Sequence, residues 1–281
     1  MFSQRPYRLA LIAMFILLGL VSYSQRDSSV TQARYRHRDG NFFIRGAVGA
    51  QGGFGVFFPT ELNNYTKDFW NALIDQYYPL HNYSGNNPVV PIIIGFNYNI
   101  KAALRLINIF QIEAYWENYY AIGLQIKSSF YQYGYGLPDM NLEATYQFIP
   151  KYEAIGGNLL LTPGAKRKSA FFVIGGGLAQ YTGSLKYHEE GTSIINDQKT
   201  TFNNTKIYKG TVLGYTFTLG VTIAPNKYLE LESFITGRLA KIPEIKDEEG
   251  NIFRNPYRNN EIVSLDFSGV DLRIGIKFIL P

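Results

Sequence analysis

The chain has 281 residues, a formal net charge of +5 and no cysteine. So small a net charge gives no indication of a nucleic-acid partner, and without cysteine neither a disulfide framework nor a lipid-anchored cysteine is available. Aromatic residues make up 16% of the chain, and glycine occurs 27 times. This mixture favours strands, tight bends and interfacial anchoring over helices.

The N-terminus has the pattern of a secretory signal peptide, which we place at residues 1–24. Arg5 and Arg8 precede the apolar run LALIAMFILLGLV, and the small residue Ser24 stands before an expected cut at Gln25. The apolar run falls short of the ~20 residues that a membrane-spanning helix needs, so we favour a signal peptide over a membrane anchor. We therefore expect an exported chain that opens with a polar lead-in over residues 25–41.

From residue 42 onward, apolar and polar residues alternate with a period of two, as they do in half-polar strands. One face carries Leu, Ile, Phe, Tyr and Trp, and the other carries charged, amide, hydroxyl and glycine residues. The pattern predicts eight strands, at residues 42–58, 89–100, 105–116, 152–162, 170–183, 211–224, 228–241 and 263–280.

Three of these segments are irregular. The strand at 152–162 changes phase around residues 156–157, and the last strand changes phase near residues 268–269, so we expect a β-bulge at each place. In 170–183 the phase is ambiguous, and three consecutive glycines indicate either close packing inside or a bend. We expect the outward pattern of 105–116 to continue through Tyr120, Ile122 and Leu124.

The strand YLELESFITGRLAK, residues 228–241, poses the question of which face is inside. Leu229, Leu231, Ile235 and Leu239 lie on one face, whereas its charged residues lie on the other. In a soluble sheet the leucines would face a core, but in a membrane barrel they would face lipid. The strand alone does not decide between the two.

The connections between strands decide the question, because they alternate between short and long. The short ones are KAAL, PGAKRKS and PNKY, and the long ones fall at residues 59–88, around YQYGYGLPDMN, at 184–209 and at 241–261. Short periplasmic turns and long extracellular loops are typical of a transmembrane barrel. A soluble lipocalin-like barrel can have the same strand number, but most of its exterior positions would be polar.

We therefore predict an all-β fold: an eight-stranded antiparallel up-and-down transmembrane β-barrel over residues 42–281, with its apolar face toward lipid. Amphipathic rings near strand ends favour the same interpretation. They are Tyr98, Trp116, Tyr120, Tyr181, Tyr215 and Tyr228.

The polar face then lines a closed lumen, where charges need partners. Directly opposed residues on antiparallel strands lie within about 5 Å of each other, so Arg273 and Lys277 on the last strand should meet Glu230 and Glu232. Eight strands enclose little more than their own side chains, so a wide aqueous pore is not expected. The predicted lumen network comprises Arg45, Glu113, Glu230, Glu232, Arg238, Asp271, Arg273 and Lys277.

The first long loop contains an amphipathic helix, TKDFWNALIDQYY, at residues 66–78. Its apolar face, which must be covered, can pack over the barrel mouth, lie in the outer leaflet, dock a partner or pack against neighbouring loops. We favour the last of these. The face comprises Phe69, Trp70, Leu73, Ile74 and Tyr77.

Together, the signal peptide, the eight alternating strands and the terminal LRIGIKFILP resemble the small outer-membrane barrels of the OmpA, OmpX and OmpW type. The SYSQ stretch and the tyrosine-rich strands resemble the Bacteroidetes members of that group, including the PorT barrel of the secretion machinery of gliding bacteria. The resemblance implies an integral protein of a Gram-negative outer membrane, with outer-membrane lipid and other envelope proteins as partners. The OmpW resemblance also allows transport or binding of a small, apolar ligand at the barrel mouth.

Catalysis is the third alternative, since some barrels of this group modify lipids. Two histidines, His81 and His188, fall in predicted extracellular loops where they could approach one another. Nothing in the sequence places either within hydrogen-bond reach of a nucleophile and an orienting partner, and surface histidines are usually solvated. The acidic runs 188–190 and 247–251 lack the spacing of a calcium loop. We predict a non-enzymatic protein with a filled polar lumen and a structural or interaction role in the cell envelope, without metal or cofactor.

Overall fold

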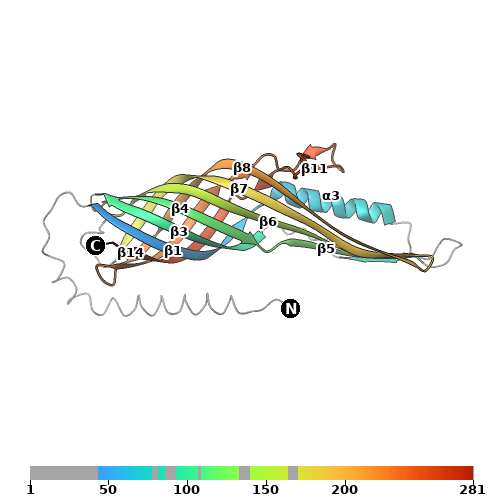
Figure 1. The fold of residues 1–281 in the computed structure, drawn as a ribbon, viewed down its shortest axis with the longest axis horizontal. Helices are drawn as coiled ribbons and strands as arrows, with labels where there is room; N and C mark the ends of the chain where they lie inside the picture. The colour runs from blue at the N-terminus through green and yellow to red at the C-terminus, as the bar shows by residue number, and fades with distance from the viewer. Residues whose placement is uncertain are drawn as a thin grey trace.

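The computed structural model of the chain describes residues 44–77, 82–85, 93–106, 109–132, 140–163 and 170–280 (Figure 1). The predicted signal peptide and the lead-in at 25–41 lie outside the described residues, as do His81 and most of the PGAKRKS turn. The predicted division of the chain therefore stays a prediction.

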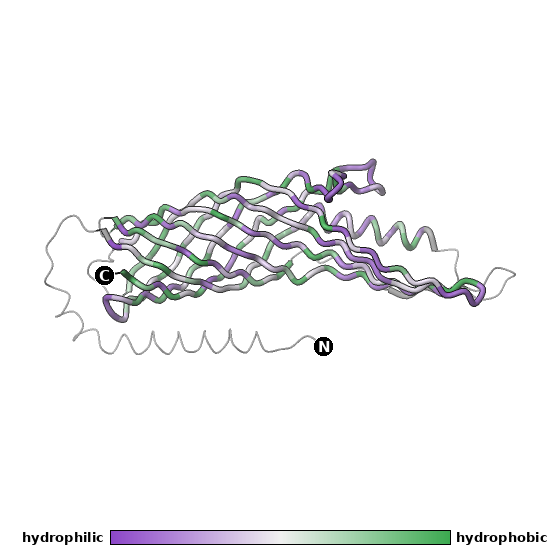
Figure 2. The backbone as a smooth tube through the Cα atoms, viewed as in Figure 1, coloured by the Kyte–Doolittle hydropathy of each residue, from purple (hydrophilic) through white to green (hydrophobic). Residues whose placement is uncertain are grey.

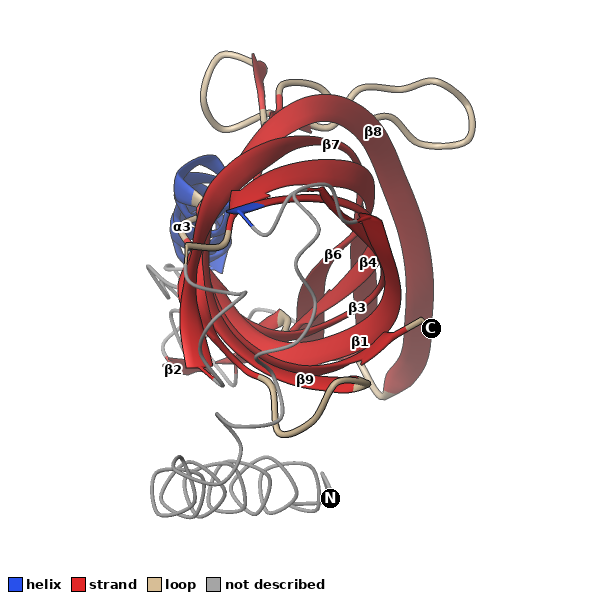
Figure 3. Cartoon of the chain, turned by 90° about the vertical axis from the view of Figure 1, so that its left-hand side faces the viewer, coloured by secondary structure: helices blue, strands red, loops and turns tan. Residues whose placement is uncertain are grey.

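Eight antiparallel strands form a closed ring, which Figure 3 shows end on. The strands follow one another round the ring in chain order, and the last pairs with the first, which closes it. The predicted eight-stranded up-and-down barrel is confirmed. The ring strands are β1 (Ile44–Phe57), β3 (Ile93–Leu106), β4 (Phe110–Ala121), β6 (Met140–Leu161), β7 (Ala170–Ile195), β8 (Gln198–Ile223), β9 (Leu229–Leu239) and β14 (Gly269–Ile279).

Burial alternates residue by residue along these strands, with apolar side chains outside and polar ones inside. On β9, Ile235 is 53% exposed and Leu239 is 67% exposed, whereas Glu230 and Glu232 are buried. The leucine face of residues 228–241 is thus the outer face. Figure 2 shows how hydrophobic and hydrophilic residues alternate along the strands of the ring.

The second strand of the ring is longer than the sequence predicted. We expected a turn at KAAL, but these residues lie within β3, where Lys101 and Ala103 are buried and Ala102 and Leu104 are exposed. The connection to β4 falls at residues 107–109 instead. Alanine fits either face of a strand, so this stretch continues the period of two without a visible apolar signal.

The predicted loop at 184–209 is also strand. β7 and β8 each run for 26 residues and pair along their whole length up to a turn at Asn196 and Asp197, whose φ angles are 49° and 61°. Asn and Asp tolerate this left-handed conformation, which suits a two-residue hairpin turn. The prediction failed because both faces of this hairpin carry polar residues, so the sequence shows no alternation.

Beyond the ring, these strands form a protruding sheet with β5 (Leu124–Gln132) and β2 (Asn82–Gly85), in the order β2-β5-β6-β7-β8. We use the name protruding sheet for β2, β5 and residues 140–148, 187–195 and 198–206 (Figure 1). β4 ends at Ala121, and Leu124 is buried at the start of β5, so the outward pattern of β4 does not extend to it.

Neither predicted bulge is present. The pairing of β6 with β4 and β7 is continuous through residues 156–157, where a Cβ added to Gly156 would lie 2.5 Å from the Cβ of Ala179. The pairing of β14 with β1 and β9 is continuous from Gly269. The apparent phase changes arise because the inner face is not polar along its whole length. Small residues line the inside of β6, and apolar side chains line the loop-end half of the ring, so inner positions there resemble outer ones in the sequence.

In the ambiguous segment 170–183 the glycines mark close packing and not a bend. A Cβ on Gly177 would lie 1.9 Å from the carbonyl oxygen of Gly157, and the pairing with β6 is unbroken. Tyr181, which we expected at the membrane interface, is buried inside the ring. The sequence pattern could not place it because the glycines on both faces removed the alternation.

The two ends of the barrel differ. The turn end carries the short β8–β9 connection PNKY, and the loop end carries helix α3 (Thr60–Tyr77) and a final loop at residues 240–268. The final loop contains two small antiparallel pairs, β10 (Lys241–Ile242) with β13 (Leu265–Asp266), and β11 (Arg254–Asn255) with β12 (Glu261–Ile262). Within the described ranges, no helix is both long and apolar enough to cross a membrane.

Candidate functional site

Charged residues from four strands meet inside the turn-end half of the ring, in what we call the lower cluster. Lys277 Nζ lies 2.8 Å from one carboxylate oxygen of Glu230 and 2.8 Å from one of Glu232. Lys101 Nζ contacts Glu232 at 2.6 Å and Glu113 at 3.0 Å. The lower cluster comprises Lys101, Arg105, Glu113, Glu230, Glu232 and Lys277.

Strand register and hydrogen bonds hold this cluster in place. Lys277 stands directly opposite Glu230 in the β14–β9 pairing. Arg105 donates to both carboxylate oxygens of Glu230, at 2.8 and 3.0 Å, in the bidentate geometry that suits a guanidinium. Gln51 Nε2 donates to Glu232 at 2.7 Å. Each carboxylate thus has a cationic partner, and the cluster holds as many cations as anions.

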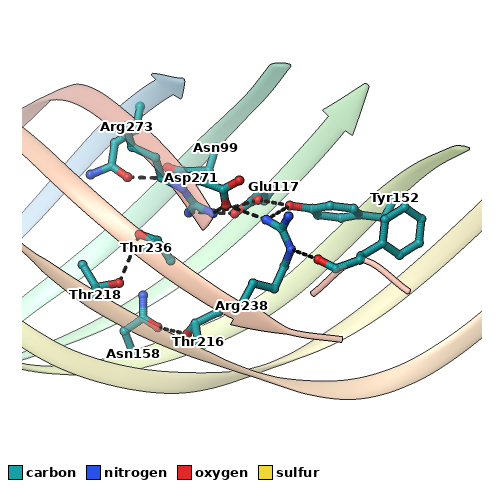
Figure 4. Close-up of polar contacts among 12 residues, drawn as sticks. Asn99, Glu117, Tyr152, Asn158, Thr216, Thr218, Thr236, Arg238, Asp271 and Arg273 are labelled. Atoms are coloured by element: carbon teal, nitrogen blue, oxygen red, sulfur yellow. Dashed lines mark hydrogen bonds and ion pairs between the residues drawn. The ribbon is translucent and has the colours of Figure 1, made fainter. Parts of the chain in front are cut away.

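A second group of charges, the upper cluster, lies nearer the loop end (Figure 4). Asp271 Oδ2 lies 2.5 Å from Arg238 Nη1 and 2.6 Å from Arg273 Nη2. Arg273 Nη1 lies 2.8 Å from Glu117, whose other oxygen accepts from the Tyr152 hydroxyl at 2.6 Å. This cluster also balances two guanidinium groups against two carboxylates.

The hydroxyl of Tyr152 connects the upper cluster to an aromatic layer above it. Arg238 donates to this hydroxyl at 2.6 Å and to the carbonyl oxygen of Phe267 at 2.7 Å. Its guanidinium carbon lies 4.8 Å from the ring centre of Tyr152 and 5.4 Å from that of Tyr119. A guanidinium held over ring faces gains electrostatic attraction in a desolvated site.

Five aromatic residues fill the loop end of the ring, and we call them the aromatic plug. Tyr119 and Tyr152 stack at 5.0 Å, and Phe267 packs 5.0 Å from Tyr152 and 5.3 Å from Phe57. All are almost fully buried. The aromatic plug comprises Phe57, Tyr119, Tyr152, Tyr181 and Phe267.

Helix α3 covers the protruding sheet and the final loop with its apolar face. The ring of Phe69 lies 4.8 Å from Tyr146, and the ring of Tyr65 lies 5.7 Å from Phe148 and 4.8 Å from Phe253. Of the predicted apolar face, Phe69, Trp70 and Leu73 are buried, Ile74 is partly buried, and the side chain of Tyr77 lies outside the described residues.

Two carboxylates fasten α3 to the final loop. Glu61 accepts from Lys241 Nζ at 2.5 Å and from the backbone N–H of Ser264 at 2.8 Å. Asp68 accepts from Asn255 at 2.7 Å. Partial burial disfavours the charged form of Glu61, but the hydrogen bonds from Lys241 and Ser264 outweigh it, so the pKa of Glu61 lies below its ordinary value.

The structure brings seven of the eight predicted lumen residues into the two clusters. Arg45 is half-buried on β1, where the register sets it opposite Arg105. The ion pairs differ in one respect from the prediction. On β14 only Lys277 pairs with Glu230 and Glu232. Arg273 pairs with Asp271 and Glu117 instead.

The predicted lumen network lacks three members of these clusters: Lys101, Arg105 and Glu117. The sequence predicts a turn at KAAL, so it gives Lys101 no inward position. Glu117 lies four residues after Glu113 and shares its parity on β4, so the alternation would have placed it in the lumen. The hydrogen bonds of Tyr152 could not be predicted from the sequence, because its hydroxyl contacts residues on two other strands, β9 and β4.

The residues weighed for catalysis or metal binding lie elsewhere. His188, on the outer face of β7, contacts the Thr205 hydroxyl at 2.8 Å and lies 3.6 Å from Glu190. In the part of the chain that the structure describes, no group of three or more His, Cys, Asp or Glu side chains is placed to hold a metal. Asp247 accepts from the backbone N–H groups of Glu249 and Asn251 in its own turn.

The fold and the two clusters together define a closed eight-stranded barrel with an apolar exterior and paired charges in its interior. No family model and no curated protein matches the chain. Among solved structures it is similar to Neisserial surface protein A, with 10% identity, a TM-score of 0.35 and coverage of 84% of this chain and 98% of that one.

Two further similar structures are Ail of Yersinia pestis and OprG of Pseudomonas aeruginosa. Ail has 9% identity and a TM-score of 0.33, over 84% of this chain and 98% of its own. OprG has 12% identity and a TM-score of 0.33, over 88% of this chain and 98% of its own. Likeness at this level does not assign the chain to a family, and the resemblance to PorT stays a prediction.

Proposed function

We propose that the chain is a non-enzymatic, integral outer-membrane protein whose barrel has a closed lumen and carries a rigid extracellular platform for a structural or interaction role in the envelope. The observation that carries the proposal is the polarity of the ring: its charges are inside and paired, and its outer face is apolar on strand after strand. A soluble barrel would reverse this arrangement.

The height of the apolar outer face matches a membrane. On β8 every outward position from Leu213 to Ile223 is aliphatic or aromatic. Ten residues at a rise of about 3.3 Å, tilted by about 40°, span about 25 Å, which is the height of the apolar band of outer-membrane barrels. We call this outer face the apolar belt.

The lumen is closed at two levels. The lower and upper clusters cross the ring with paired charges, and the aromatic plug with α3 covers the loop end. An ion that entered would have to displace buried, hydrogen-bonded pairs at a large free-energy cost. We infer that the barrel does not conduct in this conformation.

The alternative of an apolar ligand beneath the first loop has less support. The apolar face of α3, which would line such a site, is covered by the protein's own rings at Tyr146, Phe148 and Phe253. A ligand would have to displace α3 from the protruding sheet. We therefore infer that α3 stays packed at the loop end. Together with the protruding sheet it forms a surface for other envelope proteins.

The test is reconstitution of the refolded mature chain. We expect extraction only with detergent, a gel mobility that changes on heating, and no conductance steps in planar bilayers. A chain that stays soluble without detergent would contradict the membrane location. Reproducible conductance steps from a heat-modifiable barrel would contradict only the closed lumen and favour transport.

A further inference from the structure

Three exposed lysines form a group on the outer face of neighbouring strands. Lys151 on β6 and Lys209 on β8 both stand opposite Ser184 of β7, and Lys186 lies two residues further along β7. Lys186 is therefore a diagonal neighbour of both other lysines, at a distance of about 7 to 8 Å. We call Lys151, Lys186 and Lys209 the basic rim.

The charges of the basic rim are directed outward and are not neutralised within the described residues. All three side chains are exposed, and none takes part in an ion pair among the described residues. The nearest acid on the same face of β6 is Glu153, which accepts from the indole N–H of Trp116. Glu190 lies four residues beyond Lys186 on β7.

The basic rim lies just above the apolar belt. Lys209 is four residues above Leu213, which is 62% exposed. Four residues correspond to about 10 Å of height on a tilted strand. A lysine stem can extend along apolar surface while its ammonium stays in the polar layer, so the three ammonium groups reach the headgroup region.

An aromatic residue marks the same level on the neighbouring strand. Tyr120 of β4 stands directly opposite Lys151 in the register and is half exposed, and its ring stacks on Tyr98 at 6.3 Å. Exposed tyrosines gather where a barrel crosses the membrane interface. The basic rim thus continues an interfacial aromatic group from β4 onto β6, β7 and β8.

We propose that the basic rim binds the phosphate groups of lipids in the outer leaflet. The inference rests on the proposed membrane location. Ammonium groups bind phosphate as point charges, and three within one or two strand spacings suit a headgroup with more than one negative charge. A lipid is favoured over soluble phosphate because the apolar belt directly below receives the acyl chains of the same molecule.

The test compares the full-length mature chain with two triple variants of equal charge. Lys151→Gln, Lys186→Gln and Lys209→Gln remove the basic rim; Lys199→Gln, Lys206→Gln and Lys227→Gln change lysines outside it. Each protein is placed in nanodiscs of zwitterionic lipid, either alone or mixed with about one tenth, by mole fraction, of a lipid that bears a phosphate monoester. Retained lipid is counted by native mass spectrometry at low and high salt, with inorganic phosphate as competitor.

Each lysine near an anionic surface strengthens association by about fivefold, so loss of the basic rim should weaken retention of the phosphate lipid by roughly a hundredfold. The control triple variant should behave like the wild type, and salt should weaken the preference. Equal retention by all three proteins, or complete displacement by millimolar inorganic phosphate, would overturn the proposal while leaving the membrane location intact. Failure of the wild type to enter any nanodisc would overturn both.

Discussion

Lys277 and Glu232 lie 2.8 Å apart on neighbouring strands inside the ring, with almost no exposure to solvent. Removing one partner of such a pair leaves a buried charge uncompensated, whereas removing both does not. This relationship makes the lower cluster testable by stability measurements.

Lys277→Met should lower the free energy of unfolding in detergent by about 3 to 5 kcal/mol, because Glu230 and Glu232 both lose their cation from β14. Urea titration of tyrosine and tryptophan fluorescence measures the loss. The Lys277→Met, Glu232→Gln double variant restores the charge balance and should recover part of it. Ile276→Ala, on the outer face of the same strand, is the matched control; a loss there as large as at Lys277 would contradict the buried network.

Phe69→Ala should loosen α3 without unfolding the ring. The Phe69 ring packs on Tyr146 and Phe148, and loss of a buried phenyl ring costs about 3 to 5 kcal/mol. We expect faster hydrogen exchange across residues 60–75 and unchanged exchange in β9 and β14. Asn71→Ala, on the exposed side of α3, should leave exchange unaltered; equal exchange in both variants would show that the ring contacts do not hold the helix.

The attachment of α3 to the final loop should weaken in acid. The pKa of Glu61 is lowered in the folded state, so its contribution is present above its ordinary pKa and is lost as pH falls through the lower, folded value. Because Glu61 is largely solvated, the effect on stability should be well under 1 kcal/mol. We expect the protection factors at residues 60–64, which are corrected for the pH dependence of intrinsic exchange, to fall below about pH 4 in the wild type. In Glu61→Gln they should be low at all pH values; a fall in protection with acid that survives in this variant would point to another group.

The topology of the barrel can be tested with single cysteines, since the chain has none of its own. Asp197 lies at the tip of the β7–β8 hairpin, and Lys227 lies in the PNKY turn at the opposite end. On intact cells an impermeant maleimide should label the Asp197→Cys variant and not the Lys227→Cys variant. Labelling of both after the outer membrane is permeabilised is the control. The reverse pattern would place the protruding sheet in the periplasm.

The sequence predicted the ring well where one face was apolar and the other polar. On β8 and β9, alternation placed Thr218, Glu230 and Glu232 on the polar face, and the pattern of short and long connections assigned that face to the inside, where all three are buried. This works because a membrane barrel has two different surroundings on the two faces of each strand. The same alternation placed Lys277 on the inner face of the last strand, and the structure pairs it directly with Glu230.

Prediction failed where the surroundings of a strand change along its length. The protruding sheet extends beyond the ring, where both of its faces carry polar residues, so the sequence pattern predicts a loop at residues 184–209. Leu265 and Phe267 point inward like Arg273, but the lumen at their level is apolar, which imitates a change of phase. Long-range partners such as Tyr152 and Arg238 have no signal in a single sequence.

The assignment of the two faces of β9 is the central claim, and lipid-phase quenching at neighbouring positions tests it most directly. A bimane probe on the Ile235→Cys variant, refolded into liposomes, should be quenched by brominated lipid and should be inaccessible to aqueous iodide. The Thr236→Cys variant, whose side chain is buried in the lumen, should show no lipid quenching and should react with a maleimide only after unfolding. Lipid quenching at 236 together with iodide quenching at 235 would mean that the charged face meets the membrane, and would contradict the account.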